Sequence, residues 1–200
     1  MTVLRLRRAF AKARPEMRYQ ELSIPGPLLV TPTVHGDSRG WFAETFREAE
    51  FAERTGVRFV QDNQSFSAAK GTLRGLHGQT PPRAQAKLVR CLSGRLLDVA
   101  LDARVGSPTY GQWVSEELSA ENHAQLFVPA GFLHGFLTLT PDCTVAYKVS
   151  DIYSKAHDFS VAWNSAGVDW GIDSPILSQK DSDAPNFADW DSPFTYEPAS

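Results

Sequence analysis

The clearest pattern in the chain is an alternation of hydrophobic and polar positions with a period of two. In 97–102 every second residue is Leu or Val, and the residues between them are Asp or Ala. This period is typical of a β-strand and here predicts one with a single buried face. Just before it, Ser93 and Gly94 separate two hydrophobic runs, and glycine readily takes the positive φ of a tight turn. We therefore expect a β-hairpin over 88–102.

Three further hydrophobic runs predict strands at short, regular spacing. They cover 124–128, 135–140 and 144–149, and are rich in Leu, Val, Phe, Thr and Tyr. Pro, Gly and Asp residues bound them, and these residues favour turns. Short strands separated by turns are typical of an all-β sandwich or barrel.

One helix is expected, over 47–56. Ala49, Phe51 and Ala52 can share one of its faces, and Gly56 can end it in the left-handed conformation. The chain has too few helices to cover both faces of a parallel sheet. We predict an all-β fold, a closed antiparallel jelly roll with a few short peripheral helices, in preference to an α/β fold.

The composition suits one compact domain. The chain has 200 residues, 42% of them hydrophobic, and a net charge of −3. These values favour a substantial core and disfavour both intrinsic disorder and a polycation that coats nucleic acid. We expect a basic extension over 1–20, the jelly-roll domain over 21–185 and a tail rich in Pro and Asp over 186–200. No run approaches the roughly 20 apolar residues that span a bilayer, so no membrane segment is expected.

The cysteines and the start of the chain indicate the compartment. Cys91 and Cys143 lie among apolar neighbours, which is typical of packed, reduced thiols in a cytosolic protein, although a single disulfide between them stays open. Residues 1–18 are basic and lack the apolar centre of a secretory signal. An ordinary basic terminus is favoured over a mitochondrial-type presequence. We therefore expect a cytoplasmic protein.

The candidate chemistry lies in one polar segment. The sequence has no P-loop, GxGxxG, GxSxG or CxxC motif. Residues 71–90 instead carry Arg74, His77, Gln85 and Lys87 near glycines and prolines, on what should be two neighbouring strands. A cavity lined by these groups would suit an anion. The alternative is that the cations are solvated charges of a sheet face and the histidine is structural.

The spacing of Arg74 and His77 sets a geometric condition. The two positions differ by an odd number, so a regular strand would point their side chains to opposite faces. Gly75 lies between them and can mark a β-bulge. We predict an irregularity within 73–78, and regular pairing there with an outward His77 would exclude a catalytic role for that residue.

A second histidine raises the question of a metal. Residues 129–136, PAGFLHGF, resemble the second motif of cupins, jelly-roll proteins whose motif histidine, here His134, often binds a metal. Such a site also needs a His-x-His pair and a nearby Glu, whereas no carboxylate follows closely after His77. Two imidazoles alone make a poor metal site. We expect no metal and favour acid–base chemistry, with a metal-dependent cupin oxygenase or isomerase as the alternative.

The motifs together point to one family. The chain resembles dTDP-4-dehydrorhamnose 3,5-epimerase and related cupin-type sugar-nucleotide epimerases over about residues 25–185. The segments that carry the resemblance are, in chain order, GDSRGWFAETF (36–46), FVQDNQS (59–65), LRGLH (73–77), QAKLVR (85–90), DVALDAR (98–104), GSPTYGQW (106–113), LSAEN (118–122), VPAGFLHGF (128–136), AYK (146–148) and LSQKD (177–181). So many ordered matches are specific, and they agree with the all-β pattern. The fold they imply is the antiparallel double-stranded β-helix, or cupin jelly roll.

The resemblance implies an epimerisation that needs neither metal nor cofactor. His77 would remove a proton from a carbon next to the 4-keto group of a dTDP-4-keto-6-deoxy sugar, and Asp181 would hold its tautomer. Lys87 would stabilise the enolate at the 4-oxygen, and Tyr147 would protonate the opposite face of the ring. His134 would lie beside the oxyanion. The implied product is inverted at C3 and C5 and feeds the synthesis of rhamnose or a related deoxysugar.

The resemblance also implies a nucleotide site and a second subunit. Arg74, together with Arg39 from a partner subunit, would contact the diphosphate, because guanidinium groups suit phosphate oxygens. The other positions implied near the substrate are Phe42, Glu44, Gln61, Asn63 and Tyr153. Tyr153 would stack on the thymine ring. The family forms homodimers through exchanged strands, so the segment 25–46 would complete its neighbour's site.

The chain departs from the family pattern beside the proposed base. Gly78 follows His77 where the family usually has an aromatic residue, and Lys155 and Asp158 replace a common Pro and Glu. These changes leave the proposed acid, base and enolate stabiliser in place, but they leave open which carbons are inverted. The alternatives are a mono-epimerase, a 3,4-ketoisomerase of the same fold and a non-catalytic sugar-nucleotide binding module.

Overall fold

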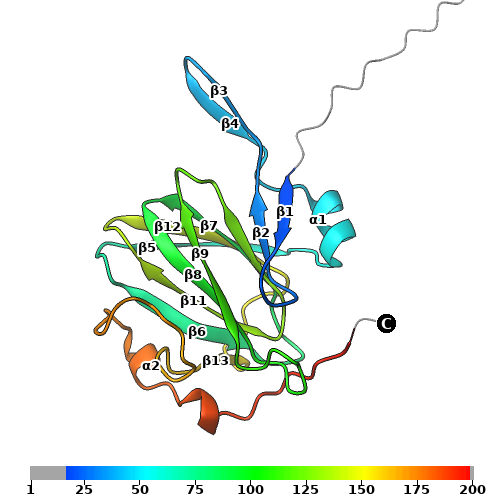
Figure 1. Cartoon of the computed structure of the whole chain (residues 1–200), viewed down its shortest axis with the longest axis vertical. Coiled ribbons are helices and arrows are strands. Elements are labelled where there is room, and N and C mark those ends of the chain that lie inside the picture. The colour runs from blue at the N-terminus through cyan, green and yellow to red at the C-terminus, as the bar shows by residue number, and fades with distance from the viewer. Residues whose placement is uncertain (1–16, 199–200) are drawn as a thin grey trace, which may run out of the picture.

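Two antiparallel β-sheets pack face to face in the computed structural model, which describes residues 17–198 (Figure 1). One sheet has six strands in the order β1-β2-β10-β7-β12-β5, and the other has five in the order β13-β6-β11-β8-β9. The chain passes repeatedly from one sheet to the other, which is the jelly-roll arrangement. The predicted all-β class is confirmed.

The strands are short, and two of them form a separate hairpin. The six-stranded sheet contains β1 (Arg18–Glu21), β2 (Leu28–Thr31), β5 (Gln61–Ser67), β7 (Lys87–Ser93), β10 (Gln125–Val128) and β12 (Cys143–Val149). The five-stranded sheet contains β6 (Leu73–Gln79), β8 (Arg95–Asp102), β9 (Trp113–Ser119), β11 (Phe132–Thr138) and β13 (Asp158–Ser160). The hairpin of β3 (Val34–Asp37) and β4 (Gly40–Ala43) projects from the body (Figure 1). The helical elements are α1 (Glu48–Thr55), α2 (Gln179–Ser182) and the 3-10 turn η1 (Phe187–Asp189).

Buried hydrophobic residues form three clusters. The first lies between the sheets and includes Val89, Leu96, Ala100, Leu126, Phe132 and Val145. The second covers the outer face of the five-stranded sheet and includes Leu73, Leu76, Val99, Leu133, Val161, Trp170 and Phe194. The third packs α1 onto the six-stranded sheet and includes Val30, Phe51, Leu88 and Phe127. The five-stranded sheet is therefore covered on both faces.

That double covering makes the prediction of a strand with one buried face wrong for β8. Val99 and Leu101 pack into the outer cluster, as their alternation suggests, but Ala100 belongs to the cluster between the sheets. Asp98 is 0% exposed. The outer cover comes from residues 161–194, far along the chain, so the local pattern does not reveal it.

The expected hairpin over 88–102 is also wrong. β7 pairs with β10 and β12, whereas β8 pairs with β9 and β11. Gly94 does take a positive φ of 79°. Its turn, however, carries the chain from one sheet into the opposite one. Local turn chemistry decides where the chain bends, and packing across both sheets decides which strands pair.

The other predicted elements are confirmed with small shifts of their ends. The runs 124–128, 135–140 and 144–149 form β10, β11 and β12. The predicted helix is α1, which buries Phe51 and ends at Gly56 with a φ of 70°.

The segment after residue 185 packs against the domain. Phe194 is buried in the outer cluster, Val105 N donates to Phe194 O at 2.8 Å, and Tyr196 N donates to Val105 O at 2.9 Å. Residues 1–16 of the expected basic extension lie outside the described residues, and Arg18–Glu21 form β1.

Neither cysteine forms a disulfide. Cys91 and Cys143 are both buried, with a distance of 3.8 Å between their Sγ atoms. The expectation of packed, reduced thiols is confirmed. Within residues 17–198, no helix has the length and apolar character that a membrane crossing requires.

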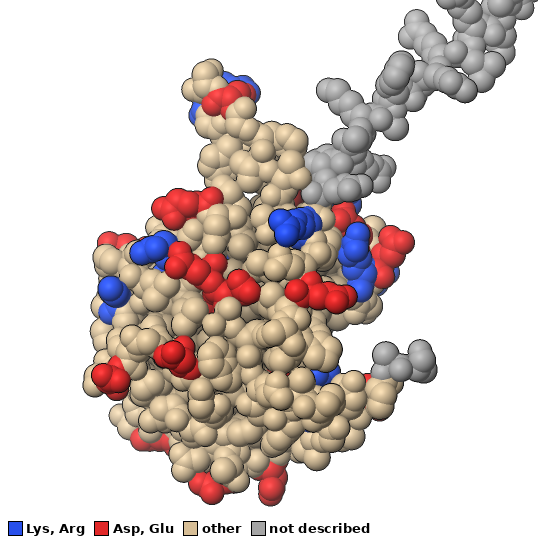
Figure 2. Space-filling view, viewed as in Figure 1, with Lys and Arg blue, Asp and Glu red and all other residues tan. Residues whose placement is uncertain are grey.

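Charged side chains are mixed on the face seen in Figure 2. Lys and Arg side chains there lie among Asp and Glu side chains over the upper part of the molecule. Specific binding of an anion therefore depends on cations gathered locally, such as those that line the cavity described below.

Candidate active site

The pairing of β6 with β11 breaks where the sequence predicts it. The register shifts between His134 and Phe136, opposite Arg74 and Gly75. Gly75 has a φ of +136°, and a Cβ at this position would lie 2.5 Å from Gly135 Cα. Only glycine fits so close an approach of two backbones. The predicted irregularity is confirmed, and Arg74 and His77 line the same cavity.

Two cavities that share lining residues lie among β5, β6, β7 and β12. The inner one has a volume of about 260 Å³ and is lined by Ser65, Arg74, His77, Lys87, His134, Phe136, Tyr147, Ser178 and Asp181. The outer one, of about 510 Å³, is lined by Gln61, Asn63, His77, Gly78, Gln79, Gln85, Lys87, Tyr147, Tyr153, Asp158 and Lys180. His77, Lys87 and Tyr147 border both, so a single elongated ligand can contact all three.

His77 is held by a carboxylate. Its Nε2 is hydrogen-bonded to Oδ1 of Asp181, a residue that is 3% exposed. Burial acts to raise the pKa of Asp181, but hydrogen bonds from His77 and Ser178 and the charge of Lys180 leave that pKa below its usual value. An ionised carboxylate can only accept, so Nε2 carries the proton of the neutral imidazole and Nδ1 keeps a free lone pair.

Local structure places Asp181 for this contact. Ser178 caps α2: its Oγ donates to Asp181 Oδ2 at 2.8 Å and accepts from Asp181 N at 3.2 Å. Just before α2, Leu73 N donates to Ile176 O at 2.9 Å, which ties this segment to the start of β6. The base and its carboxylate partner are thus anchored to the same strand.

Lys87 lies on β7 and Tyr147 on β12. These two strands are paired, and both side chains line the inner cavity. Burial lowers the pKa of Lys87 to about 8, although the charges of Asp98 and Asp158 oppose the shift. Burial raises the pKa of the Tyr147 hydroxyl, and Arg74 partly offsets that rise. At neutral pH the cavity therefore combines an ammonium group, a protonated phenol and an imidazole.

A second histidine–carboxylate pair lies deeper between the sheets. His134 Nε2 and Asp98 Oδ1 are 2.8 Å apart, and both side chains are buried. Burial lowers the pKa of His134 and raises that of Asp98, against the attraction between the two groups. Asp98 Oδ2 has no hydrogen-bond partner among the described residues. His134 is the cross-strand neighbour of His77 and lines the inner cavity.

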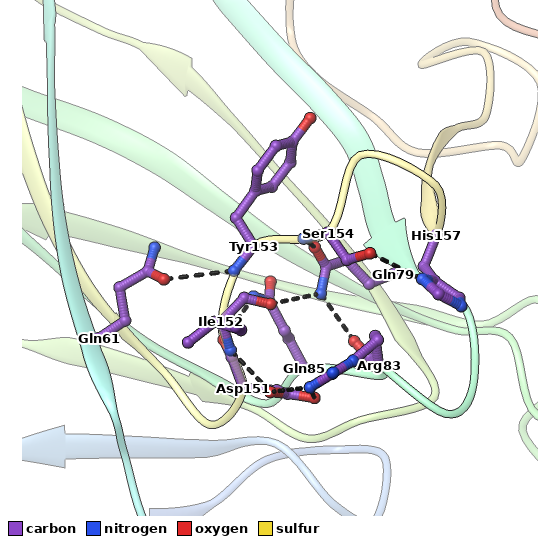
Figure 3. A network of polar contacts seen from close by, with 9 residues as sticks. All are labelled: Gln61, Gln79, Arg83, Gln85, Asp151, Ile152, Tyr153, Ser154 and His157. Atoms are coloured by element: carbon purple, nitrogen blue, oxygen red, sulfur yellow. Dashed lines mark hydrogen bonds and ion pairs between the residues drawn. The ribbon is translucent and has the colours of Figure 1, made fainter.

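A hydrogen-bonded loop forms the rim of the outer cavity (Figure 3). Tyr153 N donates to Gln61 Oε1 at 3.2 Å, and Gln61 Nε2 donates to Asn63 Oδ1 at 2.8 Å. The Tyr153 side chain is 58% exposed, and its hydroxyl donates to Asp158 at 3.3 Å. Its ring is available to a flat ligand.

The loop behind Tyr153 is fixed from β6. Gln79 accepts from Ser154 N at 2.7 Å and donates to Ile152 O at 3.3 Å (Figure 3). Gln85 donates to Asp151 O at 2.7 Å. Gln85 lines the outer cavity, as the sequence predicts, and its amide also supports the rim.

Three predicted residues lie outside both cavities in the single chain. Arg39 and Phe42 are on the projecting β3–β4 hairpin, where Arg39 is ion-paired with Asp37 at 2.6 Å and Phe42 is 67% exposed. Glu44 is ion-paired with Arg47 at 2.6 Å. The expectation that these residues serve a partner subunit's site stays a prediction.

The sequence reasoning missed Lys180, Asp158 and Asp98. Lys180 Nζ is 2.6 Å from Asp158 Oδ2, and both residues line the outer cavity. Lys180 directly precedes Asp181 in LSQKD, and that neighbourhood was the available signal. For Asp98 the signal was an acidic residue within an otherwise hydrophobic strand, which calls for a buried partner.

Among residues 17–198, no three His, Cys, Asp or Glu side chains gather in a way that could hold a metal ion. The cationic and imidazole groups of the cavity suit an anionic ligand and proton transfer instead.

Comparison with known proteins assigns the chain. Residues 21–189 match the family described as dTDP-4-dehydrorhamnose 3,5-epimerase. The chain belongs to this family. The dTDP-4-dehydrorhamnose 3,5-epimerase of Sinorhizobium fredii is 51% identical over 185 residues, which cover 90% of this chain and 95% of that one.

Solved structures of the epimerase family share the fold. One is dTDP-6-deoxy-D-glucose-3,5-epimerase from Legionella pneumophila in complex with dTDP-4-keto-L-rhamnose, with a TM-score of 0.87, 39% identity and coverage of 92% of this chain and 100% of that one. Another is a 3'-monoepimerase from Streptomyces bikiniensis in complex with dTDP-quinovose, with a TM-score of 0.80, 37% identity and coverage of 84% and 87%. The predicted family and the cupin jelly roll are confirmed.

Proposed function

We propose that this chain epimerises a dTDP-4-keto-6-deoxy sugar at C3 and C5, the two carbons next to the keto group. One observation carries the proposal: the inner cavity combines a carboxylate-paired imidazole, a half-buried ammonium group and a protonated phenol. These are the base, the oxyanion stabiliser and the acid that an enolate mechanism requires. Family membership supports the same reaction.

His77 is the general base in this scheme. With Nε2–H donated to Asp181, the lone pair of Nδ1 accepts the proton from the carbon next to the carbonyl. The imidazole then becomes a cation, and the ionised Asp181 stabilises it. The carboxylate therefore serves both to orient the ring and to balance its charge.

Lys87 stabilises the enolate. As the C–H bond breaks, negative charge develops on the 4-oxygen, and a nearby ammonium stabilises that charge more strongly than it stabilises the neutral ketone. Removal of the lysine from water strengthens this interaction and also lowers its pKa to about 8.

Tyr147 returns a proton to the opposite face of the ring. Its raised pKa keeps the hydroxyl protonated at neutral pH. Inversion requires a donor on the face away from the base, since reprotonation by His77 would regenerate the substrate. His77 on β6 and Tyr147 on β12 come from the two opposing sheets, which supports these roles.

The nucleotide extends from the inner cavity, which Arg74 lines, into the outer cavity in this proposal. Arg74, which hydrogen-bonds Phe66 O at 3.1 Å, and Lys180 supply positive charge for the diphosphate. The exposed ring of Tyr153 stacks on thymine, and Gln61 and Asn63 contact the base. His134 contacts the sugar from the inner end.

The functional unit we propose is a homodimer in which each projecting hairpin reaches the partner's cavity. The hairpin exposes Trp41 and Phe42, at 59% and 67%, a large apolar area for a monomer to leave in water. Arg39 at its tip would then meet the partner's diphosphate, and Glu44 would lie at the same border. A second copy of the chain is the partner that would contact all four of these residues.

We also propose a cytoplasmic location. Two buried, free cysteines with a 3.8 Å distance between their Sγ atoms suit a reducing compartment. The product would feed the synthesis of dTDP-rhamnose or a related deoxysugar, in keeping with the family.

The test is the incorporation of solvent deuterium into dTDP-4-keto-6-deoxyglucose, followed by mass spectrometry and proton NMR. Wild type is expected to label C3 and C5, His77→Ala to label neither, and Tyr147→Phe to exchange protons with little inversion. Label at one carbon only would instead identify a mono-epimerase, the activity of the Streptomyces bikiniensis relative. A product with its carbonyl at C3 would identify a ketoisomerase. Tight binding of the sugar nucleotide without any deuterium exchange would identify a binding module.

A further inference from the structure

Gly78 of β6 borders the outer cavity, and an aromatic ring fills the space where its side chain would lie. A Cβ at Gly78 would lie 2.7 Å from Phe159 Cζ and 2.8 Å from Phe159 Cε1. Gly78 has no positive φ, so its backbone would accept other residues. Glycine is needed at this position because the Phe159 ring occupies the space where a side chain would lie.

The ring is covered on its far side by the C-terminal segment. Phe159 stacks on Trp190, with 4.8 Å between ring centroids and an interplanar angle of 15°, and Phe194 lies 6.4 Å away. The hydrogen bond from Val105 N to Phe194 O, at 2.8 Å, anchors this segment to the domain. Phe159 is thus held between Gly78 and Trp190.

Phe159 belongs to a strand that borders the proposed active site. β13 has three residues and, within residues 17–198, pairs only with β6, where Phe159 is opposite Gly78 and Ser160 is opposite His77. The residue before Phe159 is Asp158, which is ion-paired with Lys180 at 2.6 Å. Lys180 lies on α2 next to Asp181, the partner of His77.

We propose that Gly78, Phe159 and Trp190 are positioning residues for the base. The Phe159 ring packs beside Gly78 and so stabilises β13 against β6. The ion pair between Asp158 and Lys180 connects β13 to α2. The helix α2 in turn positions Asp181 for its hydrogen bond with His77. Backbone hydrogen bonds join the segment to β6 at both ends of β13, from Thr80 N to His157 O at 2.9 Å and from Val161 N to Leu76 O at 2.9 Å, and the ring adds a side-chain attachment at the middle of this short edge strand. This inference rests on the proposed role of His77 as the base.

Four variants test the proposal. Phe159→Ala removes the ring from the space beside Gly78, and Gly78→Ala inserts a methyl group into that space. Gly78→Ala combined with Phe159→Leu restores room for that methyl group. Val168→Ala is the matched control, because Val168 is a buried residue of the same outer cluster and lies outside β6, β13 and α2. For each protein, kcat, KM, the thermal midpoint and the NMR chemical shifts of the His77 ring nitrogens are measured, the last without substrate.

Phe159→Ala and Gly78→Ala are expected to lower kcat by about tenfold or more with KM within about twofold, because misplacing a catalytic group slows the chemical step. Both should shift the His77 ring nitrogens, and the double variant should regain part of the kcat lost in Gly78→Ala. Val168→Ala should lower the thermal midpoint but leave kcat and the ring shifts unchanged.

The proposal is overturned if Phe159→Ala and Gly78→Ala keep the wild-type kcat and ring shifts and lose only thermal stability, as the control does. A wild-type protein that does not turn over the sugar would overturn the proposed function instead. The ring shifts, which need no substrate, would then decide the positioning role alone.

Discussion

His77 Nε2 and Asp181 Oδ1 form a hydrogen bond between residues that are 104 positions apart in the chain. The imidazole comes from β6 and the carboxylate from α2, which the hydrogen bond between Leu73 N and Ile176 O ties to the start of that strand. Because Asp181 is buried and ionised, it makes Nε2 the protonated nitrogen. The pair therefore supports a base that is oriented before the substrate arrives.

Asp181→Asn should reduce kcat by about 10²–10⁴-fold, because an amide can donate to Nε2 and so favour the wrong imidazole tautomer. KM should change much less, since Asp181 is not placed at the nucleotide. Epimerisation followed by NMR measures both constants. Asp183→Asn is the control, since Asp183 accepts from Gln179 at 2.9 Å on the exposed side of α2. Equal activity of the two variants would contradict the proposed pair.

The rate should fall as pH rises through about 8, because deprotonation of Lys87 removes the ammonium that stabilises the enolate. Lys87→Met should lower kcat by about 10²–10³-fold, and its rate should not show the fall near pH 8. Rates from pH 6 to 10 check the expectation. The control is Lys148→Met, which removes the lysine ion-paired with Asp62 at 2.8 Å. Its rate should still fall as pH rises through about 8.

The same pKa shift predicts how stability changes with pH. The lysine pKa falls from 10.5 in the unfolded chain to about 8 in the fold, so between these values the unfolded state binds more protons. The free energy of unfolding of wild type relative to Lys87→Met should therefore increase from pH 8 to 10.5. Urea titrations at both ends of this range measure it, and a decrease would show that the lysine is not desolvated.

Mixing two inactive variants should restore activity if the hairpin serves the partner subunit. A mixed dimer of Arg39→Ala and His77→Asn contains one site with wild-type residues at both positions, so random mixing restores about a quarter of the sites. The rate after mixing and exchange of subunits is the measurement, with light scattering to establish the dimer. No recovery from a mixed dimer would place Arg39 in its own subunit's site or in none.

Gly75→Ala should destabilise the fold by about 2–4 kcal/mol, because its Cβ would lie 2.5 Å from Gly135 Cα and its φ is +136°. Gly36→Ala should change the free energy of unfolding by less than about 0.5 kcal/mol, since the nearest atom to its Cβ is 3.8 Å away. Urea unfolding compares the two. Similar midpoints would mean that the two backbones can separate at little cost.

Much of the fold followed from local patterns. The strands β10, β11 and β12 and the helix ending at Gly56 were predictable, because alternation, propensity and turn residues act over a few positions. The break at Gly75 was predictable as well, since two polar side chains had to share one face. Strand partners were not: the turn at Gly94 joins two sheets instead of a hairpin, and nothing within 88–102 encodes which strands come alongside.

The sequence alone determined the family, the all-β class and the residue types needed for proton transfer. Motifs and hydrophobic periodicity depend only on residues that are close together in the chain. Only the tertiary structure decided that the buried Asp98 is hydrogen-bonded to His134, that Lys180 meets Asp158 and that Phe159 occupies the space beside Gly78. Each of these joins segments far apart in the chain. Such contacts depend on how whole sheets pack, and burial by a distant segment leaves no local pattern.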